Sequence, residues 1–125
     1  MPLDINTGIL DGHTGSVPVS HSLRAFNVLA ATDKQVPAEA IDFMVRERKI
    51  PTSLVAETQA DPERQKAVLF RRSSGNARVT VFEGGHDSEP AAALEWLSRQ
   101  RKGQLADWSL GQKPAKAGAA TEVSK

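Results

Sequence analysis

Cysteine is absent from the 125 residues of this chain. Without cysteine there is no disulfide bond, no thiolate nucleophile and no cysteine-based zinc site, and nothing indicates the redox state of the protein's compartment. No apolar run approaches the roughly 20 residues that a membrane-spanning helix requires, so we expect no membrane span. Residues 1–6 also lack the positively charged start and the long apolar stretch of a signal peptide.

The chain carries little net charge. Its 16 basic and 15 acidic residues leave a formal charge of +1 at pH 7. A charge so close to zero gives no electrostatic attraction to nucleic acid or to an anionic membrane surface, so neither is expected as a partner. The hydrophobic fraction of 39% and the charged fraction of 25% are those of a globular domain, and we therefore expect most of the chain to fold.

Hydrophobic periodicity predicts a strand and two helices in the first half of the chain. Leu3, Ile5 and Ile9 alternate loosely with polar residues, which is typical of a short strand that runs into a loop. Residues 18–31 carry apolar side chains at helical spacing, after a proline that suits a first helical turn. Residues 37–49 show the same pattern and end in a basic cluster, which favours a second helix directly after the first.

The second half of the chain predicts a hairpin. Residues 67–70 and 79–82 are two β-prone runs, and the segment that joins them has Gly and Asn at its centre, which is typical of a tight turn. Residues 50–64 contain two prolines and show no clear period, so we expect a loop there, with one helical turn after Asp61.

A last helix and a tail complete the expected organisation. The helix is predicted to end near Gly103, with Leu94 and Leu97 on its apolar face and Asp87 or Ser88 as its N-cap. From residue 111 onward the sequence is mostly Lys, Ala, Gly and Ser and has almost nothing to bury, so residues 111–125 should be a disordered tail. The folded part is then one domain over residues 1–110.

Two loops that follow predicted strands carry side chains suited to catalysis. Asp11 comes shortly after the first strand, and His86 comes shortly after the strand at residues 79–82. The helices between them favour a crossover that makes these two strands parallel. Loops after parallel strands emerge at the same carboxyl edge, where ligands bind in open α/β sheets, so we expect Asp11 and His86 to meet. A carboxylate beside a histidine fixes the ring's tautomer and stabilises the imidazolium that forms on proton uptake.

The residues around these two side chains form motifs. Gly8-Ile9-Leu10-Asp11 precedes Val17-Pro18, and the last strand is followed by Gly84-Gly85-His86. In this order the motifs resemble the α/β-hydrolase superfamily, especially its prolyl-oligopeptidase-like and esterase branches. The resemblance covers roughly residues 3–103. It implies an α/β fold, namely the C-terminal part of an α/β-hydrolase sheet with mainly parallel strands, a hairpin and flanking helices.

The resemblance implies a serine hydrolase that acts on ester or peptide bonds, with Asp11 as the orienting acid and His86 as the general base. It implies no cofactor. The family's nucleophile elbow, Gly-x-Ser-x-Gly, is missing, because Ser16, Ser73 and Ser74 all stand in other settings. The nucleophile and the oxyanion-hole donors are expected upstream of Met1, so the chain alone should be inactive. A fragment, a truncated reading frame and one piece of a split enzyme would all give this pattern.

Other interpretations of the same residues remain open. His86 also fits a loop histidine beside a glycine pair, and Asp11 also fits a turn-forming residue before a glycine. His13 could line the loop or contact a substrate. Asp11, His13, His86 and Asp87 are ligand types suited to zinc, although their spacing matches no specific metal-binding signature.

A module that pairs with another chain is the alternative function. About three strands are predicted, and the first of them would have a bare outer edge and would lie in a sheet with one exposed apolar face. Exposed strand edges invite pairing with a further strand. The sequence therefore also predicts self-association, or pairing with the missing N-terminal part.

Overall fold

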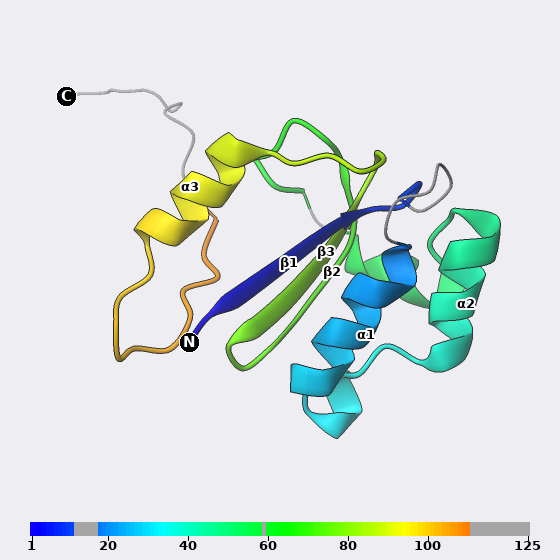
Figure 1. The fold of residues 1–125 in the computed structure, drawn as a ribbon, viewed down its shortest axis with the longest axis horizontal. Coiled ribbons are helices and arrows are strands. Elements are labelled where there is room, and N and C mark those ends of the chain that lie inside the picture. The colour runs from blue at the N-terminus through cyan, green and yellow to red at the C-terminus, as the bar shows by residue number, and fades with distance from the viewer. Residues whose placement is uncertain (12–17, 59, 111–125) are drawn as a thin grey trace.

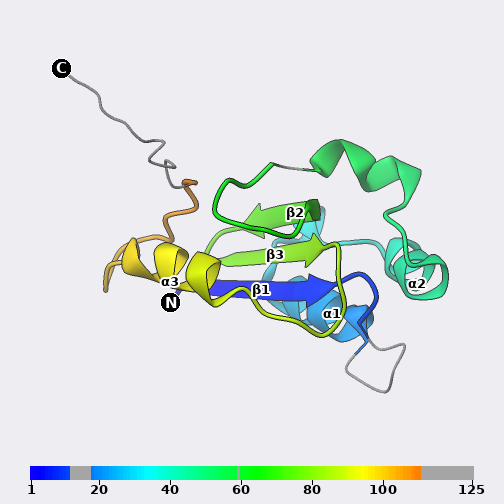
Figure 2. The ribbon, with the colours of Figure 1, turned by 90° about the horizontal axis from the view of Figure 1, so that it is seen from above.

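The chain has a small α/β fold built on a mixed three-stranded sheet (Figure 1). β1 (Leu3–Gly8) lies beside β3 (Ala77–Phe82), and β3 lies beside β2 (Val68–Ser74). β1 is parallel to β3, as predicted, and β2 is antiparallel to it, as the predicted hairpin requires. The described sheet is therefore mixed rather than mainly parallel (Figure 2). The structure is a computed structural model that describes residues 1–11, 18–58 and 60–110. The predicted disordered tail at residues 111–125 lies outside this part.

Two helices cover one face of the sheet and a third lies on the other side (Figure 1). α1 (Val19–Leu29) and α2 (Ala38–Glu47) form the crossover between β1 and the hairpin, and α3 (Pro90–Ser98) follows β3. Short 3₁₀ helices lie at Thr32–Lys34 and Thr52–Glu57. The second of these falls in the predicted loop, where Leu54 is only 6% exposed and anchors it to the core. Within the described residues, no helix is long and apolar enough to cross a membrane.

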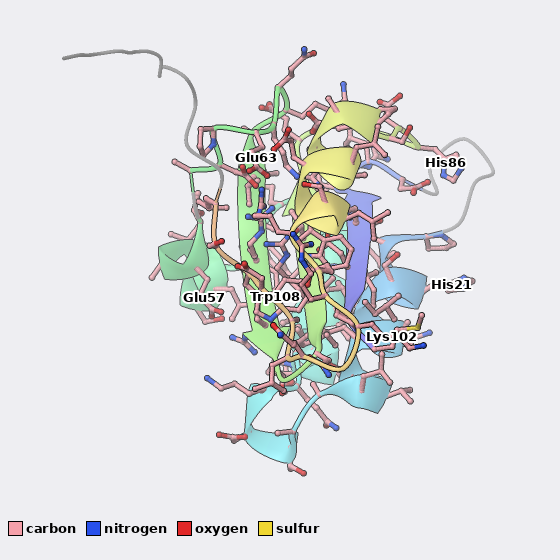
Figure 3. The ribbon with its side chains drawn as sticks, turned by 90° about the vertical axis from the view of Figure 1, so that its left-hand side faces the viewer. His21, Glu57, Glu63, His86, Lys102 and Trp108 are labelled. Carbon is pink, nitrogen blue, oxygen red and sulfur yellow. The ribbon has the colours of Figure 1, made fainter. Side chains whose placement is uncertain are left out.

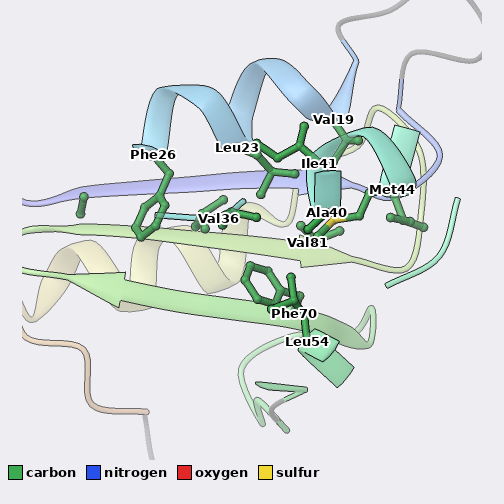
Figure 4. Packing of buried hydrophobic residues seen from close by; sticks show 13 residues of the cluster. Val19, Leu23, Phe26, Val36, Ala40, Ile41, Met44, Leu54, Phe70 and Val81 are labelled. Atoms are coloured by element: carbon green, nitrogen blue, oxygen red, sulfur yellow. The ribbon is translucent and has the colours of Figure 1, made fainter. Parts of the chain in front are cut away.

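The hydrophobic core lies between the sheet and the two crossover helices (Figure 4). The helices contribute side chains at helical spacing, and alternate residues of the strands meet them from the sheet. Burial of each large apolar side chain stabilises the folded state by about 1.5–3 kcal/mol. Most of the buried apolar residues belong to this layer, so it contributes most of the hydrophobic stabilisation. The fully buried members include Leu23, Phe26, Met44, Phe70, Val79 and Val81.

The opposite face of the sheet carries buried charges instead of the predicted exposed apolar surface. Asp4 and Arg78 are register partners on neighbouring strands, and Nε of Arg78 lies 2.8 Å from a carboxylate oxygen of Asp4. Arg71 pairs with Asp61 at 2.9 Å and donates from Nε to the hydroxyl of Thr80 at 2.8 Å. Burial lowers the pKa of the Arg71 guanidinium; the charge of Arg78 adds to this effect and Asp61 opposes it. Buried charges persist only when paired, so each depends on its partner.

Helix α3 presents a different face to the protein from the predicted one. Leu94 and Leu97 are 66% and 58% exposed, whereas Ala92 and Trp96 are buried. The ring of Trp96 stacks on Trp108 with 5.6 Å between the centroids. The large aromatic pair buries more area than two leucines would, which explains why this face turns inward.

The ends of α3 also differ from the prediction. Its N-cap is Glu89, not Asp87 or Ser88, and it ends at Ser98 rather than near Gly103. The Glu89 carboxylate does not cap the helix: it accepts a 2.7 Å hydrogen bond from the backbone N–H of Gln65 instead. The helix start is therefore tied to the loop before β2.

The hairpin between β2 and β3 has the predicted Gly/Asn turn, but its strands extend closer to the turn than predicted. Ser74 pairs with Ala77, so only Gly75 and Asn76 form the turn. Gly75 has a φ of 59°, and a positive φ at the first central residue is the pattern of a type II′ turn, which favours glycine there. The turn lies at the start of β3 and hence at the opposite end of that strand from His86.

Candidate active site

The loops that carry Asp11 and His86 leave the sheet side by side, because β1 and β3 run parallel in direct register. Their pairing continues beyond the strands. The N–H of Ile9 donates to the carbonyl of Phe82 over 2.9 Å, and the N–H of Leu10 donates to the carbonyl of Gly84 over 2.9 Å. Backbone hydrogen bonds therefore fix the start of one loop against the start of the other.

Each loop then makes a turn that places its candidate side chain, Asp11 in the first and His86 in the second. The N–H of Asp11 donates to the carbonyl of Gly8 over 3.0 Å, which closes a turn at the end of β1. The N–H of Asp87 donates to the carbonyl of Gly85 over 2.9 Å, so His86 lies at the centre of a three-residue turn. Figure 3 shows the imidazole projecting from this loop. Its side chain is 67% exposed, whereas that of Asp11 is only 9% exposed.

Asp11 and His86 form the contact that the sequence predicted. Nδ1 of His86 lies 3.1 Å from one carboxylate oxygen of Asp11 and 3.2 Å from the other. Both separations are within hydrogen-bonding distance. The prediction that these side chains meet at one sheet edge is confirmed, and the physical reason is the parallel crossover.

This geometry assigns separate tasks to the two ring nitrogens. A carboxylate accepts hydrogen bonds, so it favours the tautomer with the proton on Nδ1 and leaves the lone pair on Nε2. Among the described residues, Nε2 of His86 has no hydrogen-bond partner. A ring held in this way can take a proton at Nε2 while Asp11 stabilises the resulting imidazolium.

Comparisons with known proteins add no family to this picture. No family model, curated protein or solved structure matches the chain. The geometry of the Asp11–His86 pair and of the loops that hold it is therefore the main indication of function.

The structure describes only some of the other candidate residues. His13 and Ser16 lie outside the described residues. Ser74 is beside the hairpin turn, where its hydroxyl accepts a 2.9 Å hydrogen bond from the N–H of Ala31. Ser74 therefore lies at the opposite end of the hairpin from His86 and is not its nucleophile.

A metal site finds no support among the described residues, where no group of three or more His, Asp or Glu side chains gathers. Asp87, one of the ligand types considered, lies 3.8 Å from the ammonium of Lys66 instead. Lys66 was not among the predicted site residues. No sequence signal marks it, because its position depends on how the segment before β2 passes the end of β3.

Proposed function

We propose that the chain supplies the acid and the general base of a serine hydrolase that cleaves ester or peptide bonds. In this proposal Asp11 orients His86, and the nucleophilic serine belongs to a segment outside these residues. The observation that carries the proposal is the contact of a nearly buried carboxylate with Nδ1 of an exposed imidazole. A purely structural ion pair has no need to keep Nε2 accessible.

This geometry supports the following reaction. Nε2 of His86 takes the proton of the serine hydroxyl as its oxygen attacks the acyl carbon of the substrate. Asp11 stabilises the imidazolium, which then gives its proton to the departing alcohol or amine. In the second half of the reaction Nε2 takes a proton from water, the resulting hydroxide attacks the acyl-enzyme, and the serine leaves with the proton returned by His86.

The fold leaves room for the rest of such an enzyme. Among the described residues, β1 has β3 as its single neighbour, so its other edge is open. Beside the start of β1 is a hollow of about 630 Å³ lined by Met1, Leu97 and Leu105, among others. We propose that the chain is the C-terminal part of an α/β-hydrolase sheet, and that further strands continue this sheet beyond β1.

A labelling experiment tests this function. The chain is produced in its native cells with a C-terminal epitope tag, and the cells are treated with a fluorophosphonate that labels activated serines. The tagged protein should be labelled, or should co-purify with a labelled polypeptide if the enzyme is split. His86→Ala should abolish this labelling, because no base remains to activate the serine.

His21→Ala is the matched control, since His21 is exposed on α1. It should leave labelling unchanged. Absence of any labelled serine with the wild-type chain, or equal labelling after His86→Ala, would contradict the proposal. The purified chain alone should neither be labelled nor hydrolyse an activated acetate ester.

A second candidate function is a binding module that pairs through the open edge of β1. The observation that favours it is that the outer backbone groups of this six-residue strand have no strand partner within the described part of the chain. In this alternative the Asp11–His86 contact only stabilises two loops, so His86→Ala would leave serine labelling of any bound partner unchanged.

A further inference from the structure

The end of β1 approaches the histidine loop unusually closely at one glycine. A Cβ atom added to Gly8 would lie 2.3 Å from the carbonyl oxygen of Gly84 and 2.2 Å from that of Gly85. Real Cβ atoms essentially never come within 3.0 Å of such atoms. Both contacts are with backbone, so no side chain can rotate away to make room. Only glycine therefore allows the two loops to lie at this separation.

At the other two glycines of the site, Gly84 and Gly85, an added Cβ atom would not clash with backbone atoms. A Cβ on Gly84 would meet side-chain atoms of Phe82 and Lys66, at 3.1 Å or more. A Cβ on Gly85 would meet nothing within 4 Å. Of these three glycines, only Gly8 is required by a close backbone contact, although the sequence does not distinguish it from the other two.

The approach at Gly8 controls the distance between the acid and the histidine. Gly8 is separated by two residues from Asp11, and Gly85 immediately precedes His86. An ordinary van der Waals contact with a methyl group begins at 3.4 Å, so the Gly84–Gly85 backbone would have to retreat from β1 by more than an ångström. The Asp11–His86 contacts are already 3.1 and 3.2 Å long, so a retreat of that size exceeds the hydrogen-bond range of about 2.7–3.2 Å.

We propose that Gly8 is a positioning residue for the Asp11–His86 pair: its missing side chain sets the separation of the two loops and thereby holds Nδ1 of His86 on the carboxylate. The catalytic meaning of this role rests on the proposed hydrolase function. The positioning role does not rest on that function, because it concerns only which nitrogen of the His86 ring carries the proton, and this can be measured in the isolated chain.

Nitrogen NMR of the histidine ring tests the proposal without substrate or nucleophile. Long-range ¹H–¹⁵N spectra of the full chain, recorded where the ring is neutral, show which ring nitrogen carries the proton. The His86 signals are assigned by their loss in His86→Gln. The wild-type ring should carry its proton on Nδ1.

Gly8→Ala is then compared with Gly85→Ala, which adds the same methyl group next to His86 but in open space. Gly8→Ala should shift the His86 signals to those of a free imidazole, in which Nε2–H predominates, while the amide contacts between β1 and β3 persist. Gly85→Ala should keep the wild-type signals.

Three results would overturn the positioning role. One is a folded Gly8→Ala chain with unchanged His86 signals, and another is an equal shift in Gly85→Ala. The third is loss of the β1–β3 contacts in Gly8→Ala, since the close approach would then serve the fold as a whole rather than the pair. A failure of the serine-labelling experiment affects none of these readouts, so the two proposals fail separately.

Discussion

Asp11 and His86 are 75 positions apart in the sequence, yet both carboxylate oxygens of Asp11 lie within 3.2 Å of Nδ1 of His86. The two side chains differ sharply in exposure, at 9% for Asp11 and 67% for His86. A nearly buried carboxylate competes less with water for the ring proton, and an exposed ring offers its second nitrogen to a substrate or nucleophile. This asymmetry supports the proposed role of His86 as a general base.

The buried ion pair between Asp4 and Arg78 should be essential to stability. Asp4→Ala leaves the Arg78 guanidinium without its carboxylate in a site where both side chains are at most 6% exposed. The expected loss is about 3–5 kcal/mol in the free energy of unfolding, measured by urea denaturation. Glu47→Ala is the control, because its pair with Arg46 is 47–64% exposed and should contribute at most about 1 kcal/mol. Equal effects of the two changes would show that the Asp4 pair is not effectively buried.

The contact between Trp96 and Trp108 should hold α3 against the protein. Trp108→Ala removes the stacked ring and also the aromatic face that lies 4.8 Å from the Arg78 guanidinium. We expect a loss of about 1–3 kcal/mol in stability and a red shift of the fluorescence of Trp96, the remaining tryptophan. Leu105→Ala, at an 83% exposed position in the same segment, should change neither. Unchanged Trp96 emission after Trp108→Ala would contradict this packing.

The open edge of β1 should make the isolated chain self-associate. Light scattering after size exclusion should show a molar mass that rises with protein concentration. Leu3→Lys, at a 46% exposed position on β1, should suppress this association because a charged edge residue opposes further strand pairing. Leu29→Lys, at a 53% exposed position on α1, should not. A wild-type chain that stays monomeric at all concentrations would argue against a functional open edge.

The sequence predicted the elements whose signals are local. The crossover helices have apolar residues at a clear period, and the two parallel strands end in Gly-containing loops, so both the helices and the meeting of Asp11 with His86 could be inferred. The hairpin turn followed from Gly75 and Asn76 in the same way. In each case one local pattern and one topological rule were sufficient.

The charged side of the sheet could not be inferred in this way. Asp4 on β1 and Arg78 on β3 alternate with apolar neighbours, which normally indicates a solvent-exposed face. The ring of Trp108, which is 30 positions from Arg78 in the sequence, lies 4.8 Å from its guanidinium, and no local pattern indicates this cover. The inward turn of Trp96 in place of Leu94 and Leu97 has the same origin, because the aromatic stack forms between residues that no local pattern connects.

The close contact of Gly8 with the Gly84–Gly85 backbone could not be predicted from the sequence either. Glycine at a strand end usually indicates a turn, and nothing in the local sequence shows that two carbonyl groups of a loop about 75 positions later lie against it. Only the register of β1 with β3 brings Gly8 opposite the residues that precede Gly84.

The central claim is that Asp11 is the orienting acid of the proposed hydrolase. Its most direct test is hydrolysis by the proposed complete enzyme, in which this chain is joined or bound to a segment that carries the nucleophile. The measurement is kcat for an activated ester with Asp11→Asn, and with Asp42→Asn as a control at an exposed position on α2. Asp11→Asn should preserve the fold but favour the wrong ring tautomer, as in a serine protease where the equivalent change lowers kcat about 10⁴-fold. We expect a loss of that order for Asp11→Asn and none for Asp42→Asn. A loss below about tenfold would make Asp11 a turn residue and contradict its role as the orienting acid.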